Sequence, residues 1–326
     1  MEKIFNLGRK RIVTEPAVQC AFTGISRLKL FWALSRTPHG LLDMCTPAFA
    51  ALLWLGAFPP PEVILIGLLT TFAGYTAVYA LNDVVDYRVD REKAAAGVLA
   101  AASCDIDGVI VRHPMAQGLL SFQEGLIWAV GWAAVALVGA FILNPACVAI
   151  FLGGCALEAL YCRLWRVSPY RTLVSGAVKT SGAMAAVFAV DPQPSAALLI
   201  ALFLTLFFWE IGGQNIPNDL ADMEEDRRLQ ARTLPLHLGV ERAVTLAGVT
   251  LAAAVVLNVI VFQLSPLPHR SFFALLALAA SCYLLIWPGL RLFQCRERSI
   301  AMALFNRASY YPAVMLALVL ISLLTV

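Results

Sequence analysis

The sequence has little charge and few of the short motifs that mark soluble enzymes. Only 14% of its 326 residues are charged, whereas 60% are hydrophobic. It contains no G-x-x-x-x-G-K-[ST] phosphate loop, no G-x-G-x-x-G, no G-x-S-x-G and no H-E-x-x-H. Its basic residues are not interleaved with aromatic residues as on a nucleic-acid surface, so we expect no nucleic-acid partner. A soluble globular chain is excluded by this composition.

Cysteine is present but forms no recognisable site. The eight Cys residues include no C-x-x-C pair and no Cys/His cluster. We interpret them as small packing residues rather than as disulfides or zinc ligands. The N-terminus has no apolar stretch followed by a cleavage site, so we predict no signal peptide.

Long apolar runs dominate what is present. A membrane-spanning helix needs about 20 mostly apolar residues, and lipid cannot satisfy backbone polar groups, so these runs predict an all-α, polytopic membrane helical bundle. We expect residues 31–326 to form one transmembrane domain, preceded by a basic segment, 1–30, that is either a membrane-surface segment or a disordered tail. The nine expected spans are 31–56, 62–82, 119–142, 145–163, 171–190, 194–217, 240–264, 271–290 and 301–325.

Charge placement predicts the orientation of these spans. Of the 24 basic residues, we assign all but Arg270 to the side of the N-terminus and the even-numbered connections. By the positive-inside rule this side is cytoplasmic. We therefore expect an integral membrane protein with a cytoplasmic N-terminus and a C-terminus on the opposite side.

Two acidic segments of identical spacing follow apolar runs. Asn82 to Asp90 reads N-D-x-x-D-x-x-x-D, and the same skeleton returns 136 positions later, from Asn218 to Asp226. A helix advances about 100° per residue, so the three Asp of each copy fall within an arc of about 60°. Each copy directs three carboxylates to one side: Asp83, Asp86 and Asp90 in the first, Asp219, Asp222 and Asp226 in the second.

Six carboxylates aimed at one cavity would repel one another unless cations lay between them. Mg²⁺ takes oxygen ligands and commonly bridges one or two protein carboxylates to substrate phosphates. A single acidic pattern more often only solvates a loop between membrane helices. Because two copies share one spacing, we expect all six Asp residues to act in catalysis by holding Mg²⁺, two ions in all.

The paired motif, each copy following a membrane span on the predicted cytoplasmic side, resembles the UbiA superfamily of intramembrane prenyltransferases. His113 to Ser121 is similar to the family's R-P-L-x-x-G-x-x-S run, and Asp226 to Gly239 to its D-x-x-x-G-x-x-T-x-P-x-x-x-G tail. The resemblance covers roughly residues 30–325. It implies about nine helices around a central cavity. It also implies a polyprenyl diphosphate donor and a small acceptor, most often aromatic. Separately, the repeated order of apolar span, acidic motif, basic segment and apolar span would be explained by two similar four-helix halves plus a ninth helix.

The resemblance extends to the fourth connection. Tyr161 to Arg171 is similar to the family's Y-x-x-x-x-x-x-P-x-x-K segment. On that match Tyr161 would lie beside the allylic carbon as a catalytic residue, while Arg171 would hold phosphate oxygens in place of Lys. The alternative is that the arginines here only enforce membrane topology. The residues expected to bind substrate are Asn82, Lys93, Arg112, His113, Arg171, Gln214, Asn215, Asn218 and Arg228.

Some features keep two interpretations. His113 stands where the family has Arg, and Arg112 beside it is a candidate for supplying that charge. The stretch 94–111 is longer than in relatives and is either a helix capping the cavity or a neutral insertion. Three intramembrane acids either face the cavity or pair within the bundle. They are Asp43, Glu158 and Glu210.

The sixth span contains residues that disfavour a regular helix. Gly212, Gly213 and Pro217 lie within its last turns, just before the second acidic motif. Such residues predict a break or kink, and irregular backbone at membrane depth occurs beside cavities. Gln214 and Asn215 would then be able to hydrogen-bond an acceptor.

These features predict Mg²⁺-dependent transfer of a polyprenyl group from a polyprenyl diphosphate to an aromatic quinone precursor or a lipid precursor, within the membrane. One alternative is transfer of phosphoribose to a polyprenyl phosphate by the same fold. Another is a secondary transporter, since repeats and broken helices also occur there. A CDP-alcohol phosphotransferase would need D-G-x-x-A-R, whereas Asp107-Gly108 leads into Val-Ile-Val.

Overall fold

The computed structural model describes residues 26–95 and 111–325. Within these ranges the chain is helical and has no β-strand. Eight of its helices are long and apolar enough to cross a membrane, which confirms the all-α membrane bundle and is close to the expected nine. The basic segment 1–30, except its last residues, and almost all of the stretch 94–111 lie outside the described residues.

The first expected span, 31–56, is broken into three helices. They are α2 (Arg27–Leu34), α3 (Thr37–Asp43) and α4 (Cys45–Leu55). Arg36 adopts a left-handed backbone with φ of 44°, and Pro38 follows in the first turn of α3. A left-handed residue cannot continue a right-handed helix, and Pro fits the first turn. These breaks leave no single helix long enough to be counted as a ninth span.

Two of the next four spans begin at signals that the sequence carries locally. Ser121 and Glu124 form a capping box at the start of α6, and Asn144 with Pro145 starts α7. The helices are α5 (Pro61–Ala95), α6 (Phe122–Leu143), α7 (Pro145–Arg163) with the short η3 (Leu164–Arg166), and α8 (Arg171–Val190).

The sixth span carries the predicted break. It consists of α9 (Ala196–Trp209), the π-turn η4 (Glu210–Asn215) and α10 (Ile216–Ala221). Pro217 cannot donate a backbone hydrogen bond to the preceding turn, which favours a reorganised ladder at this point. All six residues of η4 are buried. The prediction of irregular backbone before the second motif is confirmed.

The remaining helices complete the bundle. A second π-turn, which we did not predict, precedes Pro288 in the seventh apolar helix of the described chain. The elements are α11 (Met223–Arg228), α12 (Leu234–Leu238), α13 (Val240–Leu264), α14 (Arg270–Ser281), η5 (Cys282–Ile286), α15 (Trp287–Cys295), α16 (Arg298–Ser309) and α17 (Tyr311–Leu324).

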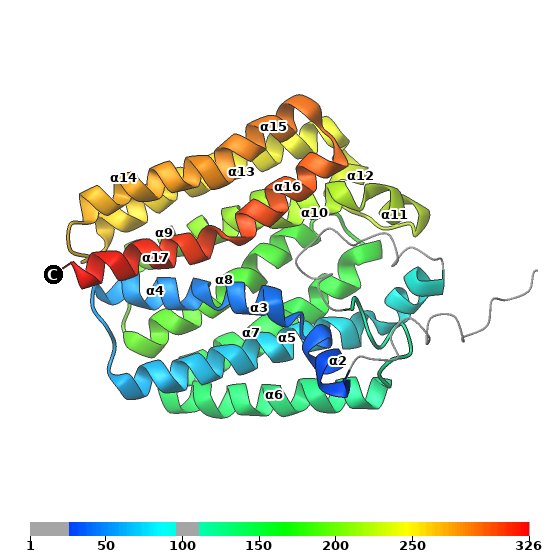
Figure 1. Ribbon diagram of the computed structural model, residues 1–326, viewed down its shortest axis with the longest axis horizontal. Coiled ribbons are helices and arrows are strands. Elements are labelled where there is room, and N and C mark those ends of the chain that lie inside the picture. Colours follow the sequence, from blue (N-terminus) through cyan, green and yellow to red (C-terminus); the bar gives the residue numbers. More distant parts are fainter. Residues whose placement is uncertain (1–25, 96–110, 326) are drawn as a thin grey trace, which may run out of the picture.

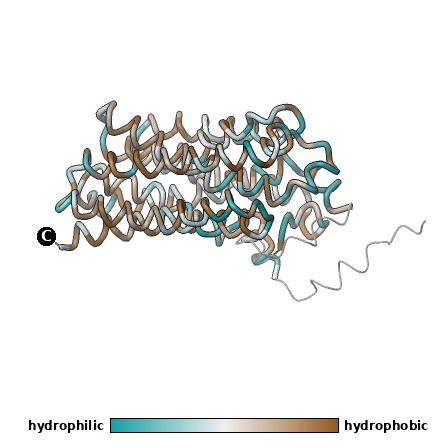
Figure 2. The backbone as a smooth tube through the Cα atoms, turned by 90° about the horizontal axis from the view of Figure 1, so that it is seen from above, coloured by the Kyte–Doolittle hydropathy of each residue, from teal (hydrophilic) through white to brown (hydrophobic). Residues whose placement is uncertain are grey.

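The long helices run side by side, and their ends differ in polarity. The short helices α11 and α12 lie at one end, and the C-terminus lies at the other (Figure 1). Hydrophilic residues gather toward the end away from the C-terminus (Figure 2). We call it the motif end, because the acidic motifs at the end of α5 and in α10–α11 lie there. Helix α5 packs along α6, α7 along α8, and α9 along α13.

The outward-facing side chains are apolar, as lipid contact requires. Ile127, Phe141 and Leu275 are each more than 60% exposed although they lie in membrane-length helices. In water such surfaces would be rare and costly. All six Cys residues of the described part are free; Cys147 and Cys162 are buried, as a packing role requires, whereas Cys282 and Cys295 are exposed.

Candidate active site

A cavity of about 640 Å³ runs through the bundle. At the motif end, residues of both acidic segments line it; at the other end its walls are apolar, with Val63, Leu143 and Ala189. Val63 and Asp86 both line it and are 23 residues apart on α5, so the cavity extends on the order of 35 Å along that helix. Its shape is that of a polar chamber continued by an apolar channel.

The first acidic motif lies on one unbroken helix. Helix α5 continues to Ala95, and both Asp83 and Asp90 on it are 3% exposed. Arg36, at the break between α2 and α3, donates hydrogen bonds to Oδ1 of Asn82 at 3.0 Å and to Oδ1 of Asp83 at 3.3 Å. The broken first span therefore brings a cation to the motif.

His113 lies between two carboxylates of the first motif. Its Nδ1 is 3.1 Å from Oδ1 of Asp83 and 3.0 Å from Oδ2 of Asp90. Its backbone is left-handed, with φ of 46°, directly before Pro114. Burial acts to lower the pKa of His113, but the carboxylates of Asp83 and Asp90 outweigh it and raise the pKa to about 9.

The second acidic motif is broken where the first is continuous. Helix α10 ends at Ala221 and α11 starts at Met223, with Asp222 between them at φ −98° and ψ 8°. The continuous helix expected for this copy is therefore wrong, because Asp222 leaves the helical conformation. Asp219 and Asp226 are nevertheless both buried, and all three Asp line the cavity.

Carboxylates of the second motif are crowded. Burial and the nearby carboxylate of Asp219 raise the pKa of Asp226 to about 7. Arg171 donates to Oδ1 of Asp219 at 2.8 Å, and Arg298 reaches Asp222 at 3.9 Å. The raised pKa of Asp226 means that its ionised form is disfavoured in this crowded site, a condition that a bound cation would relieve.

Arg171 and Tyr161 lie together. The guanidinium of Arg171 is 4.7 Å from the centre of the Tyr161 ring, within the range of a cation–π contact. Asn215, in the π-turn η4, donates to the Tyr161 hydroxyl at 3.1 Å. Gln214 instead donates to the carbonyl of Phe305 at 3.2 Å, so its amide ties η4 to α16 while it lines the cavity.

The other expected substrate-binding residues divide into two groups. Asn82, Lys93, Arg112, His113 and Asn218 line the cavity. Burial lowers the pKa of Arg112, against the opposing effect of the Asp222 carboxylate, which places Arg112 near the second motif. Arg228 is exposed and lies outside the cavity lining.

Glu158 and Asn82 join α7 to the first motif. Nδ2 of Asn82 donates to Oε1 of Glu158 at 2.6 Å, so Glu158 both pairs within the bundle and lines the cavity. Asp83 does not line the cavity, and its carboxylate is engaged by Arg36 and His113.

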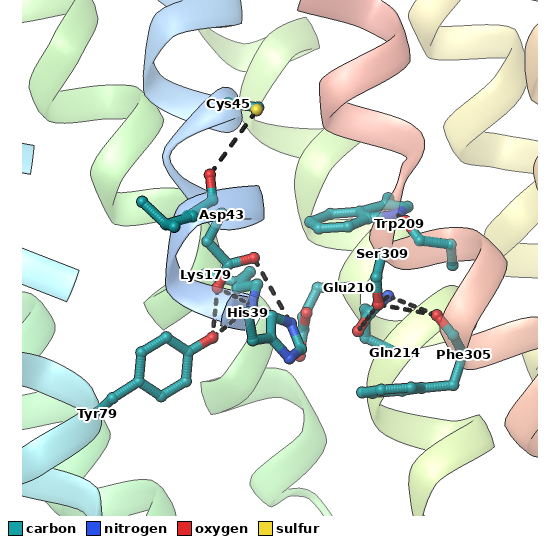
Figure 3. A network of polar contacts seen from close by, with 12 residues as sticks. His39, Asp43, Cys45, Tyr79, Lys179, Trp209, Glu210, Gln214, Phe305 and Ser309 are labelled. Carbon is teal, nitrogen blue, oxygen red and sulfur yellow. Dashed lines mark hydrogen bonds and ion pairs between the residues drawn. The ribbon is translucent and has the colours of Figure 1, made fainter. Parts of the chain in front are cut away.

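A polar network that the sequence analysis missed lies in the middle of the cavity (Figure 3). Lys179 of α8 donates to Oδ2 of Asp43 at 2.6 Å, and the Tyr79 hydroxyl donates to the same oxygen. His39 lies 3.7 Å from the other oxygen of Asp43. The predicted placement of Lys179 on the cytoplasmic face is wrong, because Lys179 lies mid-helix in a span. A lysine inside an apolar run was the signal available in the sequence.

Glu210 begins the π-turn η4 and lies next to this network in Figure 3. Its Oε1 accepts a hydrogen bond from Ser175 at 2.6 Å, while its buried Oε2 has no hydrogen-bond partner. It also lines the cavity. Asp43, Glu158 and Glu210 thus combine the two interpretations left open by the sequence: each has a partner within the bundle and faces the cavity.

The carboxylates of the two motifs fit a divalent cation. Oδ2 of Asp219 is buried without a hydrogen-bond partner. Unpaired buried carboxylate oxygens are costly unless a cation or donor satisfies them. Oxygen atoms are the ligands that Mg²⁺ requires, so the donor set at both motifs suits this ion.

The family model described as the UbiA prenyltransferase family matches residues 44–322. This chain belongs to the UbiA prenyltransferase family. It is therefore an intramembrane prenyltransferase, and a secondary transporter is not needed to explain its acidic motifs.

Similar proteins fall into two groups by name. The chain is 22% identical over 233 residues to a digeranylgeranylglyceryl phosphate synthase from Thermococcus sibiricus, covering 72% of this chain and 77% of the relative. It is 26% identical to a 4-hydroxybenzoate octaprenyltransferase from Idiomarina loihiensis, covering 66% and 71%. A solved UbiA homologue from Archaeoglobus fulgidus bound to DMAPP and Mg²⁺ has the same fold, with a TM-score of 0.68, 16% identity and coverage of 91% and 99%.

Proposed function

We propose that this prenyltransferase transfers a polyprenyl group from a polyprenyl diphosphate to an aromatic quinone precursor, in a Mg²⁺-dependent reaction. One observation carries the proposal. Two acidic motifs 136 residues apart line the same cavity, and the cavity continues into an apolar channel. The acidic chamber suits a metal-bound diphosphate, and the apolar channel suits a polyprenyl tail.

Two Mg²⁺ ions would be held by the two motifs, one set being Asp83, Asp86 and Asp90 and the other Asp219, Asp222 and Asp226. When bound, Mg²⁺ supplies Lewis-acid stabilisation of the departing diphosphate. The homologue from Archaeoglobus fulgidus was solved with DMAPP and Mg²⁺, which supports a donor and metal of this kind.

Side chains around the chamber would assist departure of the diphosphate. Arg171 carries a fixed positive charge 2.8 Å from Asp219, where it would meet the diphosphate oxygens. Lys93 lies over the Trp165 ring, 4.7 Å from its centre, and lines the same chamber. The Tyr161 ring would face the allylic carbon, whose developing positive charge an aromatic face stabilises.

Water must be kept from the allylic cation, because hydrolysis would compete with transfer to the acceptor. The channel walls beyond the chamber are apolar and include Val63, Leu143 and Ala189. Desolvation by such walls also strengthens the electrostatic contacts in the chamber.

A lipid acceptor is the second candidate. It is favoured by the relatives named digeranylgeranylglyceryl phosphate synthase, which stand beside those named 4-hydroxybenzoate octaprenyltransferase. Both candidates use the same donor chemistry, so the acidic motifs do not distinguish them. By the positive-inside rule we also propose that the motif end is cytoplasmic and the C-terminus lies on the opposite side.

The test is prenyl transfer by the purified full-length protein in detergent. Mg²⁺, labelled geranylgeranyl diphosphate and a panel of acceptors would be supplied, including 4-hydroxybenzoate and geranylgeranylglyceryl phosphate. We expect a labelled aromatic product that is lost on chelation and in both Asp86→Ala and Asp222→Ala. A product with the lipid acceptor alone would overturn the aromatic assignment. Metal-dependent diphosphate binding without transfer to any acceptor would instead favour a phosphoribosyl donor.

A further inference from the structure

Glu210, in the network of Figure 3, has one carboxylate oxygen without a partner in the described chain. The residue is only 6% exposed, and it lines the cavity. Its Oε1 accepts a hydrogen bond from Ser175 at 2.6 Å, whereas its Oε2 is buried and accepts none. An unsatisfied buried carboxylate oxygen costs free energy, so a ligand in the cavity that hydrogen-bonds Oε2 would be bound favourably.

A hydroxyl group of a ligand fits this oxygen. When Glu210 is ionised, Oε2 can only accept a hydrogen bond; when it is protonated, Oε2 can also donate one. A hydroxyl group both donates and accepts, so it satisfies Oε2 in either state. The other carboxylate of the network is already engaged, because Lys179 and Tyr79 both donate to Oδ2 of Asp43.

Helix α8 connects Glu210 to the second acidic motif. Arg171, Ser175 and Lys179 follow one another at intervals of four residues, so they share one face of α8, and all three line the cavity. Arg171 donates to Asp219, and one turn further along α8 Ser175 donates to Glu210. One such turn is about 6 Å along the helix axis. A diphosphate held at Arg171 would therefore have its allylic carbon near Glu210, where an acceptor that attacks this carbon has to lie.

We propose that Glu210 binds a hydroxyl group of the acceptor through Oε2 and takes the proton that the acceptor loses when it is prenylated. The proposal rests on the proposed function, since it places a prenyl acceptor in this cavity. It narrows the acceptors to compounds with a hydroxyl group, which the aromatic and the lipid candidates both carry.

The proposed step balances in atoms and charge. The bond between the allylic carbon and the diphosphate oxygen breaks, and its electron pair leaves with the diphosphate. A lipid acceptor would form the new bond through its hydroxyl oxygen, and the hydroxyl proton would pass to Glu210. An aromatic acceptor would form it through a ring carbon: the hydroxyl proton would pass to Glu210, and the proton of that ring carbon would then restore the hydroxyl group.

The test compares prenyl transfer by the full-length wild type and Glu210→Gln in detergent, with 4-hydroxybenzoate and geranylgeranylglyceryl phosphate as acceptors. Gln has the size of Glu and can still accept from Ser175, but it cannot take the proton. Glu241→Gln is the matched control, because Glu241 is exposed and lies outside the cavity lining. A positioned proton acceptor contributes about 10² to 10⁴ in rate, so we expect a loss of about this size in kcat for Glu210→Gln. The affinity for geranylgeranyl diphosphate with Mg²⁺ should stay unchanged in both variants.

The acidity of the acceptor distinguishes a proton acceptor from a structural residue. A 4-hydroxybenzoate with fluorine beside its carboxylate loses the hydroxyl proton more readily than 4-hydroxybenzoate itself. The ratio of the wild-type kcat to the Glu210→Gln kcat should therefore be smaller with the fluorinated acceptor. An equal ratio with both acceptors would overturn the proposal. A loss of donor affinity as large as the loss in kcat would overturn it too, because it would mean that Glu210 only supports the fold of the chamber.

A second measurement needs no variant. Benzoate lacks the hydroxyl group that Oε2 would bind, so the wild type should bind it at least about tenfold more weakly than 4-hydroxybenzoate. Equal binding of the two compounds would overturn the proposal, whether or not Glu210→Gln folds.

The role of Glu210 and the proposed reaction can fail separately. Binding of 4-hydroxybenzoate that weakens in Glu210→Gln, together with no transfer by the wild type, would support the role of Glu210 and count against the proposed function. Transfer at the wild-type rate by folded Glu210→Gln would support the proposed function and overturn the role of Glu210. Transfer to the lipid acceptor alone, lost in Glu210→Gln, would support the role of Glu210 and overturn the aromatic assignment. Neither transfer nor acceptor binding by the wild type would overturn both.

Discussion

Nζ of Lys179 lies 2.6 Å from Oδ2 of Asp43, in the middle of the cavity and 136 positions away along the chain. The pair joins α3 to α8, and the Tyr79 hydroxyl of α5 donates to the same carboxylate. Three helices therefore meet at one buried carboxylate. The opposite charges of Lys179 and Asp43 compensate each other at membrane depth.

Removing one member of this pair should destabilise the protein more than removing both. Lys179→Met leaves the Asp43 carboxylate buried without its cation, which we expect to lower the free energy of unfolding by about 3 kcal/mol or more. Asp43→Asn should have a similar effect. Free energies measured by SDS titration of the protein in detergent should show that the double variant is less destabilised than either single variant. Additive losses would mean that the two side chains do not interact.

Arg171 should contribute to catalysis through its charge. Removing one group that stabilises charge in a transition state commonly costs about 10² to 10³ in rate, so we expect a loss of about this size in kcat for Arg171→Ala. Arg171→Lys should keep much of the rate, because it keeps the charge. Arg163→Ala is the matched control, since Arg163 is exposed and lies outside the cavity lining. The measurement is the steady-state rate of prenyl transfer by each variant. Equal losses of kcat in Arg171→Ala and Arg163→Ala would contradict a local role for Arg171.

The π-turn before the second motif should not tolerate a side chain at Gly212. A Cβ there would lie 2.4 Å from Oγ1 of Thr250 and 2.7 Å from the carbonyl oxygen of Ala247 on α13. Gly212→Ala should therefore cost about 1–3 kcal/mol by overpacking. Gly248→Ala on α13 meets nothing within 4 Å and should be neutral or stabilising by up to about 1 kcal/mol. Thermal unfolding of both variants in detergent gives the comparison; equal stability would mean that α13 can move aside.

Filling the apolar channel should shift the preferred donor toward shorter chains. Ala189 lines the cavity far from the motifs, so Ala189→Phe would shorten the space for a polyprenyl tail. We expect kcat/KM to fall for long donors and to change little for geranyl diphosphate. Ala197→Phe is the control, because Ala197 is exposed and does not line the cavity. A uniform loss across donor lengths would place the tail elsewhere.

Much of the bundle could be predicted because the signals are local. Apolar runs of membrane length, the capping residues before α6 and α7, and the Gly and Pro residues around η4 act within a few neighbours in the sequence. The spacing within each acidic motif is also a local signal. It identified the carboxylates at the end of α5 and in α10–α11 that line the cavity. The division into two similar four-helix halves remains a prediction.

Other features depended on contacts between distant segments. Lys179 is one cation in an apolar run, and only the fold places Asp43 beside it. The break at Asp222 differs from the continuous helix at Asp86, although the two motifs have the same spacing. The sequence could not distinguish them, because packing around α10 and α11 decides whether the helix continues there.

By itself, the sequence determined that this protein is a helical membrane prenyltransferase of the UbiA type with two acidic motifs, since hydrophobicity and motif spacing are properties of short segments. The tertiary structure alone decided which side chains meet. It placed His113 between Asp83 and Asp90, and Arg171 against Asp219. The physical reason is that electrostatic and hydrogen-bonding partners are chosen by distance in space, and only the packing of the helices sets that distance.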